Sequence, residues 1–185
     1  FDNLTYLHGK PQGTGLLKLP DNCNVLQWKS CTGGSFRELV GKGVTEIGSF
    51  AFNDLIETDY LAFGSGLRIV GDAPFADSYI NRIYFGCHEI PTGSYEETYD
   101  QYESYWKDYE NVTLYVPRDA VDKFKSHKVW GMAKKILPIE DTEFAYLADT
   151  ELDAVDEVKA SSTAMPHCIY SPTGVKFNRP IKGLN

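Results

Sequence analysis

The sequence from Leu39 to Gly48 reads LVGKGVTEIG, and residues 62–71 read AFGSGLRIVG. The two stretches are 23 positions apart and carry apolar residues and glycines at matching places. Phe52 and Phe75 repeat at the same interval. A fixed period of this length is typical of proteins built from stacked units, each of which buries its apolar side against its neighbours.

This repeat predicts a mostly β fold of the α+β class, a short right-handed β-solenoid. Each coil would contribute a short strand, and the strands around residues 39–40, 62–63 and 83–85 would pair in parallel at about 4.8 Å. Gly48 and Gly71 follow at the point where the absence of a side chain permits the backbone to reverse.

The repeat also predicts which side chains meet inside the stack. We expect Ile47 to lie over Val70, and Phe52 over Phe75 as part of an aromatic ladder, because each ring buries enough area to dominate its coil. A single coil cannot be stable alone, since its apolar faces need neighbours above and below. The fold prediction therefore depends on one continuous apolar interior.

Composition divides the chain into three predicted regions. Residues 1–35 hold scattered glycines and prolines and are expected to form an irregular N-terminal cap or a degenerate first repeat, with a short strand at residues 16–19. Residues 36–140 carry the repeat domain. Residues 141–185 are expected to form an acidic linker and a C-terminal tail, of which residues 167–177 read as a hairpin.

An aromatic stripe follows the repeats. Ser94, with Glu97 three residues later, fits a helix capping box, and five rings then recur at helical spacing. These candidate ligand-binding residues are Tyr95, Tyr99, Tyr102, Trp106 and Tyr109. Tyr and Trp rings provide rigid amphipathic contact area, so the inserted helix could stack on sugar rings or a peptide. The alternative, which the same spacing favours, is that the helix packs these rings on the repeats.

The segment after the stripe alternates strand and helix patterns. Residues 112–116 predict a strand that Pro117 stops, because proline has no N–H to donate to a sheet. Residues 119–125 predict a short helix, and residues 136–139 predict a last strand.

Charge argues against nucleic acid as a partner. The net charge is −8, and eight acidic residues without an intervening Lys or Arg account for it: Glu140, Asp141, Glu143, Asp149, Glu151, Asp153, Asp156 and Glu157. The rest of the chain is near neutral and offers no basic footprint for phosphate groups. No sequence window has the run of about 18 apolar residues that a membrane span requires.

The sequence contains no catalytic, metal or cofactor motif. The four cysteines, Cys23, Cys31, Cys87 and Cys168, lack C-x-x-C spacing, which argues against zinc. Cys23 and Cys31 could form a disulfide, and free buried thiols are an equally good interpretation. Cys87 and His88 are neighbours whose side chains would point to opposite faces of a strand, so a nucleophile and base pair is not expected.

The acidic residues of the stripe have two interpretations. Glu96, Glu97, Asp100 and Glu103 could ligate calcium, but they lack the spacing of an EF-hand, and a solvated helix face is favoured. A glycan hydrolase that uses Glu96 and Asp100 is the least favoured function, because hydrolytic carboxylates lie across a cleft and no cleft is predicted.

The chain resembles the BspA-like leucine-rich repeat family, whose repeats carry the phrase V-T-x-I-G-x-x-A-F. Residues 44–52 match this phrase closely, and residues 67–75 match it loosely. Arrays of this family often finish with an L-Y-V-P strand, a short helix and a W-x-x-x-x-x-I segment, which residues 114–117 and 130–136 match. The resemblance covers roughly residues 36–140.

This resemblance implies a secreted or surface-exposed bacterial protein, usually without enzymatic activity, in a family associated with adhesion. Residues 169–177 and 181–185 are also similar to a C-terminal export segment of Gram-negative anaerobes, which normally continues further, so the tail is expected to be a truncated export or attachment segment. We therefore expect a non-enzymatic module without a cofactor that binds a host or matrix protein or a glycan. The alternative is a structural or assembly spacer in a larger surface complex.

Overall fold

The computed structural model describes residues 15–34, 36–149, 169–170 and 176–177. The chain divides into two units, Phe1–Asp153 and Ala154–Asn185, and each is considered by itself.

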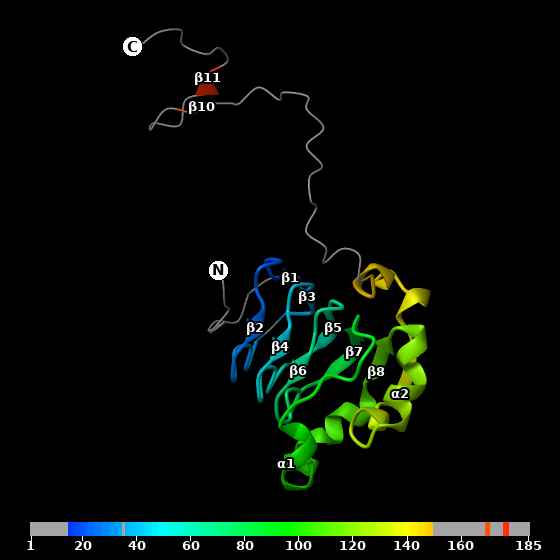
Figure 1. The fold of residues 1–185 in the computed structure, drawn as a ribbon. Helices are drawn as coiled ribbons and strands as arrows, with labels where there is room; N and C mark the ends of the chain where they lie inside the picture. The colour runs from blue at the N-terminus through cyan, green and yellow to red at the C-terminus, as the bar shows by residue number, and fades with distance from the viewer. Residues whose placement is uncertain (1–14, 35, 150–168, 171–175, 178–185) are drawn as a thin grey trace. The chain divides into compact units, whose positions relative to one another are not determined.

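The main element of the first unit is a six-stranded parallel sheet (Figure 1). In spatial order its strands are β1 (Leu16–Lys18), β3 (Glu38–Gly41), β5 (Thr58–Phe63), β7 (Ile80–Phe85), β8 (Thr113–Val116) and β9 (Lys135–Pro138). Spatial order follows chain order, so each strand lies beside the previous one. Parallel neighbours need crossover connections, because the chain must return to the same end of the sheet before each new strand.

Short strands form the first crossovers. They are β2 (Val25–Leu26), β4 (Glu46–Ile47) and β6 (Ile69–Val70), and they pair in parallel as a three-stranded sheet of their own. Ile47 lies opposite Val70 in this sheet, so the predicted pairing of these two residues is confirmed. The parallel pairing of β3, β5 and β7 is confirmed as well.

Helices form the later crossovers. Between β7 and β8 the chain forms α1 (Tyr95–Tyr102) and the 3₁₀ helix η1 (Glu103–Asn111). Between β8 and β9 it forms η2 (Arg118–Ala120), α2 (Val121–Ser126) and η3 (Trp130–Met132), and after β9 it forms η4 (Ile139–Asp141) and η5 (Ala145–Leu147). The helix predicted to follow Ser94 is present, but the capping box is wrong, since the Ser94 side chain makes no capping hydrogen bond.

The prediction of a mostly β solenoid is wrong. The described chain has an α/β fold with a parallel central sheet of six strands, a small three-stranded sheet and helices. The repeat accounts for the strands up to β7 only. The aromatic-rich sequence after β7 forms α1 and η1, and the sequence after β8 forms η2 and α2, so helices replace the short strands as crossovers for the rest of the central sheet.

The middle strands of the central sheet, β3, β5 and β7, pack against apolar clusters on both faces, as strands of parallel sheets usually do. Leu39, Leu61 and Ile83 belong to the larger core cluster, which also contains Ile47 and Val70 of the small sheet. Their neighbours along the strands point the other way, and a second cluster contains Val40, Tyr60, Ala62 and Tyr84 together with Ile139, Phe144, Leu147 and Ala148. This alternation follows from the two-residue period of side chains in a strand.

Phe52 and Phe75 stack inside the larger core, with ring centroids 6.0 Å apart and an interplanar angle of 20°. The predicted aromatic contact is therefore confirmed. Tyr109 of η1 extends the stack, its ring centroid 6.4 Å from that of Phe75. The helical segment thus continues the interior that the repeat begins.

Gly48 and Gly71 recur at the repeat spacing because the backbone is in close contact at both positions. A Cβ atom at Gly48 would lie 2.8 Å from the Trp28 amide nitrogen, and one at Gly71 would lie 2.4 Å from the Ser49 amide nitrogen. Left-handed backbone occurs two residues further on, at Lys29, Phe50 and Ala73. Glycine is therefore required at these positions for close packing as well as for the predicted reversal, because any side chain there would collide with the preceding turn.

The described part of the second unit is an antiparallel pair, β10 (Ile169–Tyr170) and β11 (Lys176–Phe177). This pair lies within the predicted hairpin, whose remaining residues are outside the described part of the chain. Among the described residues, no helix is long and apolar enough to cross a membrane.

Candidate functional site

The five candidate rings of the aromatic stripe lie mainly in the core. Tyr95, Tyr99, Trp106 and Tyr109 are buried, and Tyr102 is half-buried against it. The packing alternative therefore describes the four buried rings. A ring enclosed on its faces and edge by other side chains has no surface left for a sugar or peptide.

Helix geometry explains this burial. Tyr95 and Tyr99, four residues apart, share one face of α1, as 3.6 residues per turn require. Trp106, Tyr109 and Val112, three residues apart, are all buried where the chain follows η1, because a 3₁₀ helix has three residues per turn. The spacing of the stripe alternates between four and three residues, and four of its five rings are buried along α1 and η1.

A groove of about 450 Å³ crosses the small sheet on its outer side. Its lining comes from four successive turns of the chain: Gln27, Trp28, Glu46, Ile47, Gly48, Ser49, Ile69, Val70, Gly71 and Ser94. The groove is therefore positioned by β4, β6 and the start of α1. Its size is within the range of roughly 300–1,000 Å³ that small-molecule sites occupy.

Two large apolar side chains stand open to solvent in this groove. Trp28 is 62% exposed and Ile69 is 44% exposed. The Lys29 ammonium lies 4.9 Å from the centroid of the Trp28 ring, a cation–π contact that holds the indole in place. Burying a tryptophan ring is strongly favourable, so an exposed indole at a groove makes this surface the candidate binding site.

Polar side chains border the same groove. Within the described chain, the side chains of Gln27 and Glu46 make no hydrogen bond or ion pair. Ser49 is engaged, since its hydroxyl accepts a hydrogen bond of 3.0 Å from the Asp72 amide. The groove therefore offers both a free amide and a free carboxylate beside an indole.

Part of the groove lining is backbone, at Gly48 and Gly71. A Cβ atom at either glycine would collide with backbone of the preceding turn, so successive turns stack directly on one another at these two positions.

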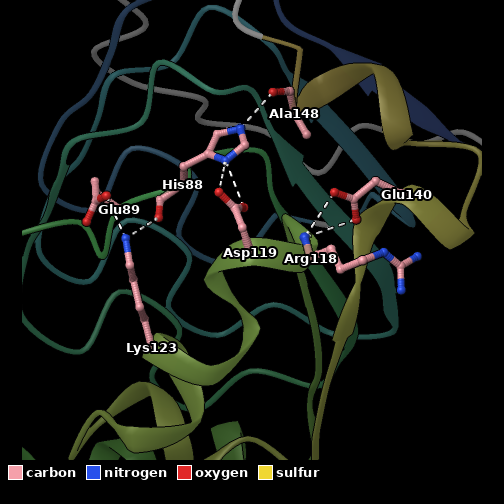
Figure 2. A network of polar contacts seen from close by, with 7 residues as sticks. All are labelled: His88, Glu89, Arg118, Asp119, Lys123, Glu140 and Ala148. Atoms are coloured by element: carbon pink, nitrogen blue, oxygen red, sulfur yellow. Dashed lines mark hydrogen bonds and ion pairs between the residues drawn. The ribbon is translucent and has the colours of Figure 1, made fainter.

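A polar network lies where β7, β8 and β9 end (Figure 2). The His88 ring, after β7, places Nδ1 2.9 Å from Oδ1 of Asp119 in η2 and Nε2 3.1 Å from the Ala148 carbonyl oxygen. Lys123 of α2 pairs with Glu89 at 2.6 Å, and the Arg118 amide donates to Glu140 at 2.9 Å.

This network does not resemble a catalytic site. Both ring nitrogens of His88 already have partners, so neither is free to take a proton from a nucleophile. Burial raises the pKa of the neighbouring Cys87 thiol to about 12, which leaves almost no thiolate at neutral pH. Cys87 and His88 follow the end of β7 and lie outside a strand, so the predicted reason for their separation does not apply. Cys87 is buried, whereas His88 is half-exposed.

The remaining sequence candidates form no site among the described residues. Cys23 and Cys31 are free buried thiols, so of the two interpretations the free form is present, and Cys168 lies outside the described residues. The described chain contains no group of three or more His, Cys, Asp or Glu side chains that could hold a metal ion. Glu96, Glu97, Asp100 and Glu103 are exposed, and Asp100 pairs with Lys128 at 2.7 Å.

Sequence reasoning missed Trp28 because it falls in the region interpreted as an irregular cap. One signal was present. Gln27 precedes Gly48 by 21 residues, which is close to the 23 residues between Gly48 and Gly71. No protein-family model matches the chain, and the search of solved structures finds no match.

Proposed function

We propose that the protein is a non-enzymatic binding module that takes a glycan in the groove over β4 and β6. The observation that carries this proposal is the exposed Trp28 indole beside the side chains of Gln27 and Glu46, which make no hydrogen bond or ion pair with any described residue. The surface or secreted location that the family resemblance implies stays a prediction.

The chemistry of a sugar ring fits this arrangement. A pyranose has an apolar face of C–H groups and an edge of hydroxyl groups. The indole offers a flat apolar surface for the face. The Gln27 amide can donate and accept, and the Glu46 carboxylate can accept two hydrogen bonds, so together they suit hydroxyl groups that do both.

The groove favours a neutral or weakly charged chain of sugars over an extended peptide. A peptide needs backbone partners, which a free strand edge supplies. The edge of β6 beside the groove is already engaged, because Ile69 forms a parallel bridge with Thr92 and the Val70 amide donates to the Thr92 carbonyl at 2.9 Å.

An assembly role is the second candidate. Strand β9 is the last strand of the central sheet in the described chain, and Leu137 on it is exposed. An exposed strand edge can pair with another chain. Exposed Lys135 on the same strand opposes such pairing, since a lysine on an edge strand discourages association, so this role ranks below glycan binding.

A glycan array probed with the purified chain tests the proposal. We expect binding to a restricted set of glycans and a loss of at least about tenfold in affinity for Trp28→Ala, the range expected when one stacked ring is removed. Tyr79→Ala is the matched control, because Tyr79 is 74% exposed but lies outside this groove.

Each other outcome identifies a different failure. Glycan binding that Trp28→Ala leaves unchanged would move the site elsewhere on the protein. An absence of binding, together with a concentration-dependent rise in mass by light scattering, would favour the assembly role.

A further inference from the structure

The segment from Ile139 to Ala148, here named the strap, covers the second face of the central sheet. Its residues Ile139, Phe144, Leu147 and Ala148 form one cluster with Val40, Tyr60, Ala62 and Tyr84 of the sheet. The Phe144 ring centroid lies 4.9 Å from that of Tyr60 and 4.5 Å from that of Tyr84. The strap therefore shields an aromatic surface from water.

His88 holds the end of the strap. Its Nε2 faces the Ala148 carbonyl oxygen at 3.1 Å, and its Nδ1 faces both carboxylate oxygens of Asp119 at 2.9 and 3.0 Å (Figure 2). A carbonyl oxygen and an ionised carboxylate can only accept hydrogen bonds. Both ring nitrogens must therefore donate, and only the imidazolium form of histidine carries two N–H groups.

We propose that His88 is a pH-controlled clasp, whose imidazolium ties the strap to the end of β7 and whose deprotonation loosens the strap from the tyrosine face beneath it. In the neutral ring, one nitrogen presents a lone pair instead of a proton. If the proton stays toward Asp119, the Nε2 lone pair then faces the lone pairs of the Ala148 carbonyl, and the contact becomes repulsive.

The charged groups around the ring favour the closed state near neutral pH. The hydrogen bond that His88 donates to Asp119 is the largest cause of the raised pKa of His88, and Glu140 on the strap also raises this pKa. Partial burial opposes this rise. Lys123 and Glu89 neutralise each other beside the ring, at 2.6 Å.

The pH window follows from two shifts. The raised pKa of His88 means that its stabilisation is complete below the ordinary value of 6.5 and is lost as pH rises through the higher folded-state value. The hydrogen bond from His88 lowers the pKa of Asp119, so its contribution is lost only as pH falls through a value below 3.8. The clasp is closed between these limits.

Other contacts keep the strap attached when the clasp opens. The Arg118 amide donates to Glu140, and the Arg118 guanidinium pairs with Asp141 at 2.6 Å. The expected change is therefore a local opening at residues 145–148, with the central sheet intact.

Two measurements on the full chain test the clasp. NMR of the His88 ring should give a pKa above 6.5 with both nitrogens protonated at about pH 6. Hydrogen exchange, corrected for intrinsic rates, should show the protection of the Leu147 and Ala148 amides falling roughly threefold to tenfold as the ring deprotonates, the effect of one ordinary hydrogen bond.

Variants separate the clasp from general packing. His88→Gln should leave the protection of these amides independent of pH over this range. Asp119→Asn changes an exposed residue and should lower the pKa of His88. The pH at which the protection falls should shift down by the same amount. Glu89→Gln leaves both partners of the His88 ring in place, so the protection should still change as His88 titrates. The midpoint should fall, because Lys123 then lacks its counter-charge beside the ring. A neutral His88 ring at about pH 6 would overturn the proposal, and so would amide protection that does not change as His88 titrates.

Discussion

Gly86 lies so close to Leu147 that a Cβ atom at Gly86 would come within 2.0 Å of the Leu147 carbonyl oxygen. The end of β7 and the strap therefore meet backbone to backbone. This contact depends on the absence of a side chain, and the strap can reach His88 and Asp119 only because Gly86 leaves room for it.

Gly86→Ala is expected to displace the strap. The added methyl group cannot be accommodated without moving backbone, and overpacking of this kind costs about 1–3 kcal/mol of unfolding free energy. Urea denaturation measures the loss, and hydrogen exchange locates it at residues 144–148. Gly66→Ala is the matched control, because a Cβ atom there meets only the Thr45 side chain at 3.6 Å. Equal stability of the two variants would contradict the contact.

Tyr95→Phe is expected to destabilise the fold without changing its architecture. The Tyr95 hydroxyl accepts a hydrogen bond of 2.9 Å from Nε1 of Trp130 and donates to the Pro91 carbonyl. Its removal leaves a buried donor without a partner, which costs about 1–3 kcal/mol.

Tyr102→Phe serves as the control for this change. Tyr102 is half-buried, and with the described residues it makes ring contacts but no hydrogen bond through its hydroxyl. Thermal and urea unfolding of both variants measure the difference. Loss of glycan binding by Tyr95→Phe at full stability would return the aromatic stripe to the list of contact surfaces.

Glu57→Gly is expected to raise stability. Glu57 is exposed and has a φ of 61°, in the left-handed region that disfavours side chains. Relief of this strain, less the extra flexibility of glycine in the unfolded chain, should add roughly 0.5–1 kcal/mol to the unfolding free energy. Glu57→Ala keeps the strain and should change little, so urea midpoints that rank alanine above glycine would refute the explanation.

Cys31 and Cys87 are expected to resist alkylation in the folded protein. Burial is the largest cause that raises the pKa of each thiol from 9.0 to about 12. At a given pH below 9, this lowers the thiolate fraction by about 1,000-fold, and only the thiolate reacts. Mass spectrometry after iodoacetamide treatment measures the modification of each cysteine. Labelling of either residue as fast as in urea-unfolded protein would contradict the burial.

Part of the fold could be predicted from the repeat. Equal spacing placed Ile47 opposite Val70 and Phe52 against Phe75, because residues that occupy the same position in successive turns become neighbours when parallel strands pair. The fold class could not be predicted in this way, since the repeat stops at β7. The helices that connect the later strands lie in sequence that does not continue the repeat, so the period says nothing about how they pack.

The candidate site shows the same division. Aromatic spacing from Tyr95 to Tyr109 identified a helix, but spacing alone cannot distinguish a ring that faces a ligand from one that faces the core. Trp28 carried no such pattern, and only its place at the end of the small sheet leaves its indole in solvent.

By itself, the sequence determined much of the local order of this protein: where the strands of the central sheet lie, where a helix follows Ser94, and which side chains recur in register. These depend on neighbours along the chain and on a fixed period. The tertiary structure alone decided which aromatic rings are buried, that the strap covers Tyr60 and Tyr84, and that His88 meets Ala148, 60 residues away. Contacts over such distances arise when separate crossovers pack on one sheet, and no local pattern encodes that packing.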